Sequence, residues 1–256
     1  MARQAIFVTG AASGIGRATA QLFARKGWFV GLYDVNEAAL ATLAKELGSE
    51  NCCAEKLDVT NYALVEAAMS QFAERSEGRL DVLFNCAGLM QVGAFETLEI
   101  QGHRRLVDVN IVGVLNCTYA AFPWLKATPN SHVITMSSAS AVYGVPELAT
   151  YSASKFFVRG ITEALNIEWR RYGITVCDLM PPYVNTPMVQ QARRAKSMDR
   201  LGVKLVPEQI AATVWRAAHG KKVHWPVSLQ FKFLYILSRM LPTGMNRLVM
   251  RWISGF

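Results

Sequence analysis

The chain has 256 residues, a hydrophobic fraction of 52% and a formal net charge of +8, so we expect one globular domain with a large core. We expect no secretory signal and no membrane span, because no charged leader and no stretch of about 18 uncharged apolar residues is visible. The five cysteines and four histidines show no metal-ligand spacing. We therefore expect a cytoplasmic protein without a metal site.

Strand-like apolar runs alternate with helical patterns along the whole chain. The predicted strands are residues 4–9, 28–33, 52–57, 81–85, 131–137, 173–179 and 222–225. Such alternation is typical of βαβ crossovers. We expect a Rossmann-type, doubly wound sheet of seven parallel strands in a single domain, with ligands bound beyond the carboxyl ends of the strands.

A glycine-rich turn, T-G-A-A-S-G-I-G, follows the first predicted strand. Its glycines, Gly10, Gly14 and Gly16, allow tight backbone dihedrals and close approach to a pyrophosphate. The helix that follows offers N–H groups and a positive dipole end to the phosphates. A plain glycine-rich loop is the alternative, but the strand-turn-helix context favours a dinucleotide site.

Asp34 ends the second predicted strand, eighteen residues after Gly16. A carboxylate at this place accepts hydrogen bonds from the ribose 2′-hydroxyl of a dinucleotide and repels a 2′-phosphate. We therefore expect NAD(H) to be preferred over NADP(H). The alternative is that Asp34 caps the helix predicted after it.

Tyr151 and Lys155 lie four residues apart, so a helix places them on one face. A phenol has a pKa near 10, and a neighbouring ammonium is expected to lower it. The pair is a candidate proton donor and acceptor. Two such residues on a solvated helix are common, but Ser138, thirteen residues upstream, adds a hydroxyl for a substrate oxygen.

These segments together resemble the short-chain dehydrogenase/reductase family over the chain up to about residue 225. The resemblance implies a catalytic set of Asn110, Ser138, Tyr151 and Lys155. It also implies cofactor contacts by Gly10, Ser13, Gly14, Ile15, Gly16, Asp34, Asp58, Val59, Asn85, Ala87, Gly88, Tyr151, Lys155, Pro181, Val184 and Thr186. In this reading Asn110 holds a water that links Lys155 to solvent, Asp58 binds the adenine and Thr186 contacts the nicotinamide carboxamide.

The chain departs from the family pattern at Pro182, where glycine is usual. Proline removes an N–H and fixes φ, which leaves open the conformation of the local backbone and of the substrate-facing loop. Residues 187–206 follow and carry five basic residues against one acid. They are expected to form a mobile lid or, alternatively, a solvated basic loop.

The last part of the chain is apolar and basic. From residue 209 to the end there are seven Lys and Arg and no acid, whereas residues 1–208 carry a net charge of only +1. Residues 227–241 and 245–253 form short amphipathic patterns, with Lys232, Arg239, Arg247 and Arg251 on polar stripes. We expect a catalytic domain over residues 1–225 and a helical extension over 226–256. The extension suits a membrane surface, or alternatively it closes the substrate pocket or packs on a partner subunit.

The function expected from these features is NAD(H)-dependent interconversion of an alcohol and a ketone or aldehyde, with Tyr151 as general acid and base. The apolar extension favours a lipid-, retinoid- or steroid-like substrate. We expect a homo-oligomer, dimer or tetramer, with peripheral membrane contact and no nucleic-acid binding. The rival hypotheses are a non-catalytic nucleotide-sensing or membrane-interaction protein, and a lyase or epimerase of related fold. A hydrolase is disfavoured, because no G-x-S-x-G elbow surrounds Ser138.

Overall fold

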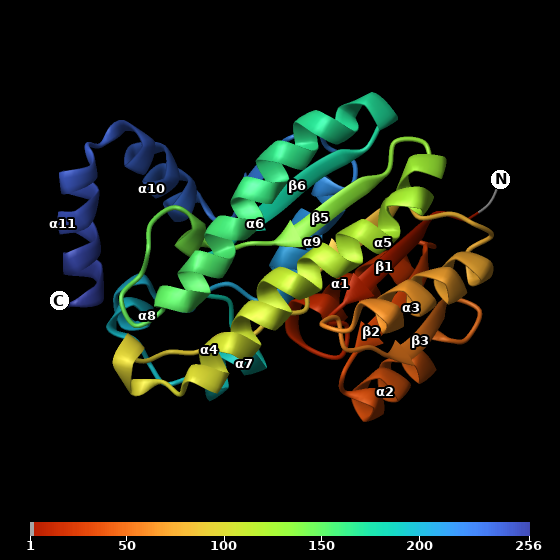
Figure 1. Ribbon diagram of the computed structural model, residues 1–256, viewed down its shortest axis with the longest axis horizontal. Coiled ribbons are helices and arrows are strands. Elements are labelled where there is room, and N and C mark those ends of the chain that lie inside the picture. Colours follow the sequence, from red (N-terminus) through yellow and green to blue (C-terminus); the bar gives the residue numbers. More distant parts are fainter. Residues whose placement is uncertain (1–2) are drawn as a thin grey trace.

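Seven parallel strands form one twisted sheet at the centre of the molecule (Figure 1). The computed structural model describes residues 3–256, apart from the side chain of Arg239. The strands are β1 (Ala5–Thr9), β2 (Phe29–Asp34), β3 (Cys52–Lys56), β4 (Val82–Asn85), β5 (His132–Met136), β6 (Thr175–Met180) and β7 (His224–Pro226). Their order is β3-β2-β1-β4-β5-β6-β7. The predicted strands and the doubly wound fold class are confirmed.

Helices cover both faces of the sheet and bury separate apolar clusters. One face carries α1 (Gly14–Arg25), α2 (Glu37–Leu47) and α9 (Pro207–Ala217). The other carries α3 (Tyr62–Arg75), α5 (Gly113–Ala127) and α6 (Ala149–Glu168). The strands in between are nearly continuous apolar runs, as expected for a sheet that is buried on both faces.

Three segments join into one long helix across the sheet. They are α4 (Ile100–Val107), a π-helical turn η2 (Asp108–Val112) and α5. By length and composition alone, residues 100–127 are long and apolar enough to cross a membrane. Their buried side, which includes Cys117, Ala121 and Leu125, packs in the core under the sheet, so we read this segment as a core helix.

A hydrogen-bonded cluster of His224, Asp178 and Glu163 fixes the edge strand β7, from which the C-terminal extension leaves the sheet. His224 Nδ1 lies 2.9 Å from a carboxylate oxygen of Asp178, and its Nε2 lies 3.0 Å from Glu163 on α6. Burial opposes protonation of His224, but the hydrogen bonds to the two carboxylates outweigh it and raise the imidazole pKa. The cluster therefore ties the root of the extension to the helix that carries Tyr151.

Residues 187–206 form two short helices, α7 (Pro187–Gln191) and α8 (Lys196–Leu201), and return to the body through a bridge between Val184 and Leu205. Ala195 and Met198 are buried among apolar side chains. The alternative of a merely solvated basic loop is therefore wrong.

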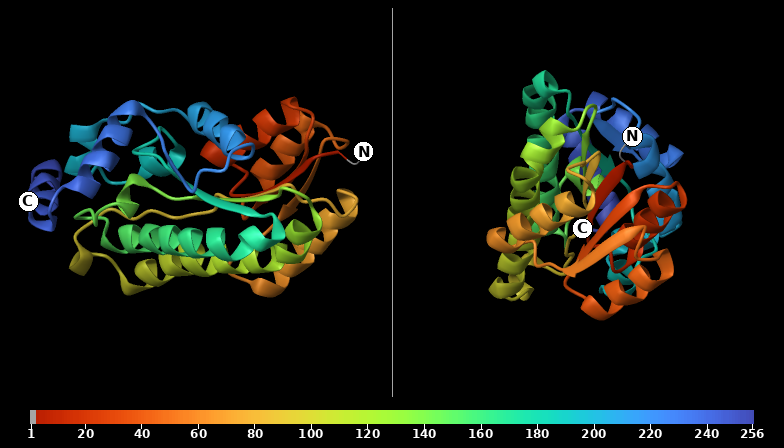
Figure 2. Two further views of the ribbon diagram at one scale, coloured as in Figure 1. Left: turned by 90° about the horizontal axis from the view of Figure 1, so that it is seen from above. Right: turned by 90° about the vertical axis from the view of Figure 1, so that its right-hand side faces the viewer.

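The chain ends in two helices, α10 (Leu229–Met240) and α11 (Thr243–Ser254), which we call the tail hairpin. The hairpin lies at one end of the molecule's long axis, opposite the end that carries the N-terminus (Figures 1 and 2). Phe231 and Tyr235 anchor it by packing against Ala141 and against Met180 at the end of β6. Three short turns, η1 (Phe95–Thr97), η3 (Ala139–Ala141) and η4 (Trp169–Tyr172), complete the elements.

Candidate active site

The glycine turn lies against the loop after β4. Thr9 Oγ1 accepts hydrogen bonds from the backbone N–H groups of Cys86 and Ala87, at 3.0 and 3.1 Å. A Cβ added at Gly10, where φ is +68°, would lie 2.8 Å from Ala87 N. Only glycine fits this close approach without strain. The turn after β1 and the loop after β4 therefore contact each other through their backbones.

The start of α1 suits a phosphate group. Gly14 also has a positive φ of +50°, and a Cβ at Gly16 would overlap the carbonyl oxygen of Gly10. Ser13 is the N-cap but makes no side-chain cap hydrogen bond. The first-turn N–H groups of α1 therefore face the cavity uncapped by Ser13, which is the arrangement that binds an anion. These residues fit a dinucleotide pyrophosphate.

Asp34 lies at the carboxyl end of β2, on the wall of the same cavity. One carboxylate oxygen accepts from the N–H of Ala12 in the glycine turn, at 3.0 Å, and the other accepts from Asn36 N–H. The N-cap of α2 is Asn36, whose side chain accepts from Ala39 N–H. The alternative that Asp34 caps this helix is therefore wrong.

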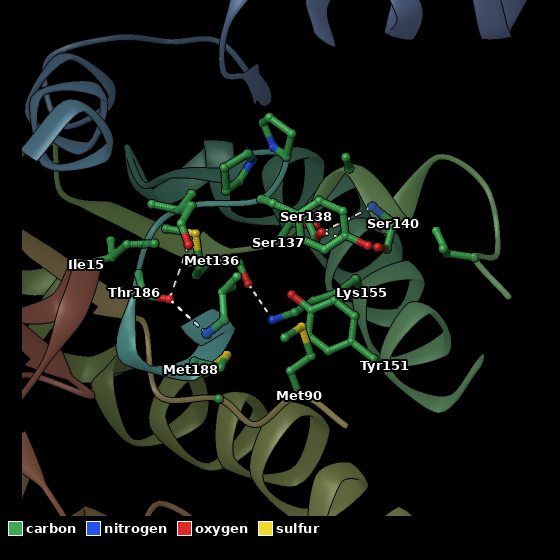
Figure 3. A pocket seen from close by; sticks show the side chains of 18 of the residues that line it. Ile15, Met90, Met136, Ser137, Ser138, Ser140, Tyr151, Lys155, Thr186 and Met188 are labelled. Carbon is green, nitrogen blue, oxygen red and sulfur yellow. Dashed lines mark hydrogen bonds between the residues drawn. The ribbon is translucent and has the colours of Figure 1, made fainter. Parts of the chain in front are cut away.

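Tyr151 and Lys155 point into the cavity from one face of α6, beside Ser138 at the end of β5 (Figure 3). Lys155 Nζ lies 5.4 Å from the centre of the Tyr151 ring and donates a 2.9 Å hydrogen bond to Met136 O. Ser138 Oγ accepts a hydrogen bond from Ser140 N–H. Three groups that could exchange or orient a proton thus meet at one point.

Burial sets the protonation of this cluster. Burial raises the pKa of Tyr151 to about 12, although a hydrogen bond with Ser138 acts in the opposite direction and lowers it. Burial also lowers the pKa of the Lys155 ammonium to about 8. The sequence-based expectation of a lowered tyrosine pKa is therefore wrong for this arrangement, because desolvation disfavours the phenolate more than nearby groups favour it. The phenol is protonated at neutral pH.

Asn110 and Asn85 do not form part of the cavity wall. Asn110 Oδ1 accepts from Leu89 N–H at 2.8 Å, and its amide nitrogen donates to Leu89 O and Ser154 Oγ. Asn110 sits in the π-helical turn η2, a distortion frequent at functional sites. A Cβ on Gly88 would lie 3.3 Å from Asn110 Oδ1 and 4.0 Å from Lys155 Nζ, so these two polar groups face a common point.

Asn85 is buried and acts inside the fold. Its amide nitrogen donates to Thr118 Oγ1 and Thr135 Oγ1, at 3.1 and 3.4 Å. These bonds join the end of β4 to α5 and to the neighbouring strand β5. Asn85, predicted as a cofactor contact, thus bonds side chains inside the fold and is not among the residues of the cavity wall.

The other predicted contacts lie on the cavity wall: Asp58, Val59, Ala87, Gly88, Pro181, Val184 and Thr186. Pro182 also lines the wall. Val184 pairs with Leu205, and Thr186 is the N-cap of α7, with its hydroxyl accepting from Val189 N–H.

The cavity has a volume of about 650 Å³ and extends past Tyr151 to the tail hairpin. The side chains that line the cavity between Tyr151 and the tail hairpin were not predicted from the sequence as wall residues. They include Met90, Tyr143, Val145, Tyr183, Leu237 and Met250. Most are apolar and belong to loops or to the hairpin. Tyr183 alone lay in a recognised motif, and its hydroxyl contacts Ser197 Oγ at 2.8 Å.

Residues 4–197 match the family model described as short chain dehydrogenase. The chain belongs to this family of oxidoreductases, which act on CH–OH and C=O groups. This establishes the class of the reaction and the kind of fold.

Three similar proteins represent the family. Oxidoreductase UcpA of Salmonella typhimurium is 35% identical over 195 residues, covering 75% of this chain and 73% of its own. Cyclohexanol dehydrogenase of an Acinetobacter species is 31% identical over 213 residues, covering 81% and 84%. A crystal structure of 3-ketoacyl-(acyl-carrier-protein) reductase from Brucella melitensis complexed with NADH has a TM-score of 0.79 at 27% identity, covering 88% and 96%.

Proposed function

We propose that the protein is an NAD(H)-dependent oxidoreductase that interconverts an apolar secondary alcohol and its ketone, or an alcohol and an aldehyde. The observation that carries the proposal is the convergence of Ser138, Tyr151 and Lys155 in one cavity between the glycine turn and the apolar tail hairpin. Bound NAD(H) would supply or accept the hydride. The cyclohexanol dehydrogenase among the relatives supports a hydrophobic alcohol as substrate.

In this proposal each residue of the cluster has a separate task. Tyr151, protonated at neutral pH, donates its proton to a carbonyl oxygen during reduction and receives one from the alcohol during oxidation. Ser138 hydrogen-bonds the same oxygen and orients it. Lys155 is fixed by its bond to Met136 O, and it supports the phenolate that forms when the proton leaves. Asn110 holds Leu89 and faces the same point as Lys155, so we assign it to the proton path.

The cofactor assignment rests on Asp34. Its carboxylate is held at the end of β2 by the N–H groups of Ala12 and Asn36, beside the turn that fits a pyrophosphate. A 2′-phosphate at this place would meet a negative charge, whereas a ribose diol would donate hydrogen bonds to it. We therefore propose that NAD(H) is preferred over NADP(H). The NADH in the Brucella melitensis reductase is consistent with this preference.

The proposal extends to the rest of the chain. Residues 1–225 form the catalytic domain and residues 226–256 an extension that closes the substrate side. The five cysteines are free thiols, which suits a reducing, cytoplasmic setting. Exposed apolar side chains on α5 and α6, such as Tyr119 and Ile167, offer a surface for a homo-oligomer.

The test is turnover followed at 340 nm with NAD(H). Cyclohexanol, a long-chain secondary alcohol and ethanol are compared for oxidation, and the matching carbonyl compounds for reduction. The apolar substrates are expected to give kcat/KM at least about tenfold above the short one, because apolar burial contributes about 0.8 kcal/mol per CH₂. NADH binding without turnover on any of these compounds would support the non-catalytic alternative and contradict the proposal.

A further inference from the structure

The tail hairpin has two apolar faces, and only one of them is used inside the protein. The inner face lines the cavity next to the catalytic cluster. Its apolar lining residues include Leu234, Leu237, Leu241, Val249, Met250 and Ile253. An amphipathic helix that simply closed a pocket would be polar on its other side. The outer side of this hairpin is not polar.

The outer face of α10 carries a stripe of exposed apolar side chains at helical spacing. Leu229, Phe233, Ile236 and Met240 are 83%, 68%, 61% and 77% exposed. The outer side of α11 continues the pattern with Met245, Leu248 and Trp252, of which Trp252 is 70% exposed. None of these seven side chains lines the cavity. Exposed apolar surface of this extent, on two neighbouring helices, marks an interaction site.

The charged residues of the tail hairpin itself are all basic. Lys232 flanks the stripe on α10, and Arg247 and Arg251 flank the apolar side of α11, all exposed. The side chain of Arg239 lies outside the described part of the chain. No Asp or Glu occurs after Glu208. A second copy of this chain, packed face to face through the hairpin, would bring the same basic groups together, whereas an anionic surface would neutralise them.

We propose that the outer face of the tail hairpin docks on an anionic lipid bilayer. The apolar stripes insert at the interface and the flanking Lys and Arg contact the lipid headgroups. Because the inner face of the same two helices lines the cavity, an apolar substrate passes from the bilayer along the hairpin to Tyr151. This second statement rests on the proposed function, whereas docking itself does not.

The experiment is flotation of the full-length protein with vesicles, without cofactor or substrate. Vesicles of phosphatidylcholine alone are compared with vesicles that also contain phosphatidylglycerol. Binding to the anionic vesicles is expected to be at least about tenfold stronger and to weaken as salt is raised, because screening acts over about 8 Å at physiological ionic strength. Equal binding to both vesicles, or to neither, overturns the proposal.

Two double variants, each with a matched control, locate the contact. Phe233→Gln with Ile236→Gln should weaken vesicle binding at least about tenfold, since two large apolar groups lose their burial. The matched control, Leu64→Gln with Ile100→Gln, replaces exposed apolar residues elsewhere and should bind normally. Lys232→Gln with Arg251→Gln should weaken binding about 30-fold, and Lys45→Gln with Lys56→Gln should not. An unchanged melting temperature confirms that each variant is folded.

Light scattering and turnover separate the remaining outcomes. A lower molecular mass in solution for the Phe233→Gln, Ile236→Gln variant would show that a second copy covers the stripe, and this would overturn bilayer docking. Turnover of a water-soluble substrate without vesicles should be unchanged in that variant. A protein that floats but never turns over would contradict the proposed function alone, and one that turns over but never floats would contradict docking alone.

Discussion

The two ends of the cavity are built in different ways. At the nucleotide end, backbone packs on backbone: Thr9 bonds the loop after β4, and Gly10 lies too close to Ala87 for any Cβ. At the substrate end, flexible apolar side chains such as Leu237 and Met250 form the wall. We therefore expect the first end to set the cofactor and the second to set the substrate.

The largest effect is expected at the glycine turn. Gly10→Val adds a Cβ within 2.8 Å of Ala87 N at a φ of +68°, so it should raise the Kd for NADH at least about 100-fold, or about 2.7 kcal/mol. Fluorescence titration with NADH measures this. Gly160→Ala is the control, because a Cβ there meets nothing within 4 Å. If Gly10→Val raises the Kd for NADH less than about threefold, backbone packing does not shape the nucleotide end of the cavity as described.

The pH dependence should differ between the two reaction directions. Because burial raises the pKa of Tyr151 to about 12, the phenol stays protonated from about pH 5 to pH 7, below the pKa of about 8 at Lys155, and can donate its proton to a carbonyl. The rate of alcohol oxidation needs the phenolate, so its kcat/KM should rise about tenfold per pH unit in this range, while that of reduction stays flat. Initial rates at 340 nm in both directions check this. Oxidation that is independent of pH would argue against Tyr151 as the proton acceptor.

The cofactor preference should respond to one charge. Asp34→Asn keeps an oxygen that can accept a hydrogen bond from Ala12 or Asn36 and removes the negative charge. The ratio of kcat/KM for NADH to that for NADPH should fall about tenfold, equivalent to about 1.4 kcal/mol. Glu37→Gln, on the exposed start of α2, is the control and should leave the ratio unchanged. A preference of the unmodified protein for NADPH would contradict the role of Asp34.

The smallest effect is expected at the substrate end. Leu237→Trp narrows the cavity at the inner side of α10. It should raise KM for long-chain alcohols about fivefold, which is within the range of discrimination between substrates by hydrophobic pockets. KM for cyclohexanol should change less than about twofold. Ile236→Trp, one residue away on the outer side, is the control for soluble substrates. Equal effects of both variants would show that the hairpin does not select the substrate.

The sequence predicts the nucleotide end well because each of its parts is local. Apolar runs predict the seven strands within one or two residues, and the glycine spacing predicts the turn. The carboxyl ends of parallel strands then bring Gly10, Asp34 and Ser138 to one edge of the sheet. The helical spacing of Tyr151 and Lys155 does the same for the acid–base pair.

Other features depend on tertiary packing and could not be predicted in this way. The raised pKa of Tyr151 comes from burial by distant segments, which residue spacing does not reveal. The sequence does not show which side of the helix in residues 227–241 faces the cavity, because both sides of α10 are apolar. Periodicity therefore cannot separate the cavity wall from the exposed stripe. The burial of Met198 likewise arises from packing with Val92 and Leu148, which lie far away in the sequence.

The most direct test of the account is Tyr151→Phe, which removes one hydroxyl and keeps the ring. With cyclohexanone and NADH, or the best apolar substrate found, kcat should fall about 10²–10⁴-fold, while the Kd for NADH changes less than about threefold. Tyr143→Phe, at another tyrosine of the same cavity, should keep at least about half of the activity. Near-normal turnover by Tyr151→Phe, with NADH binding intact, would contradict the assignment of Tyr151 as the proton donor.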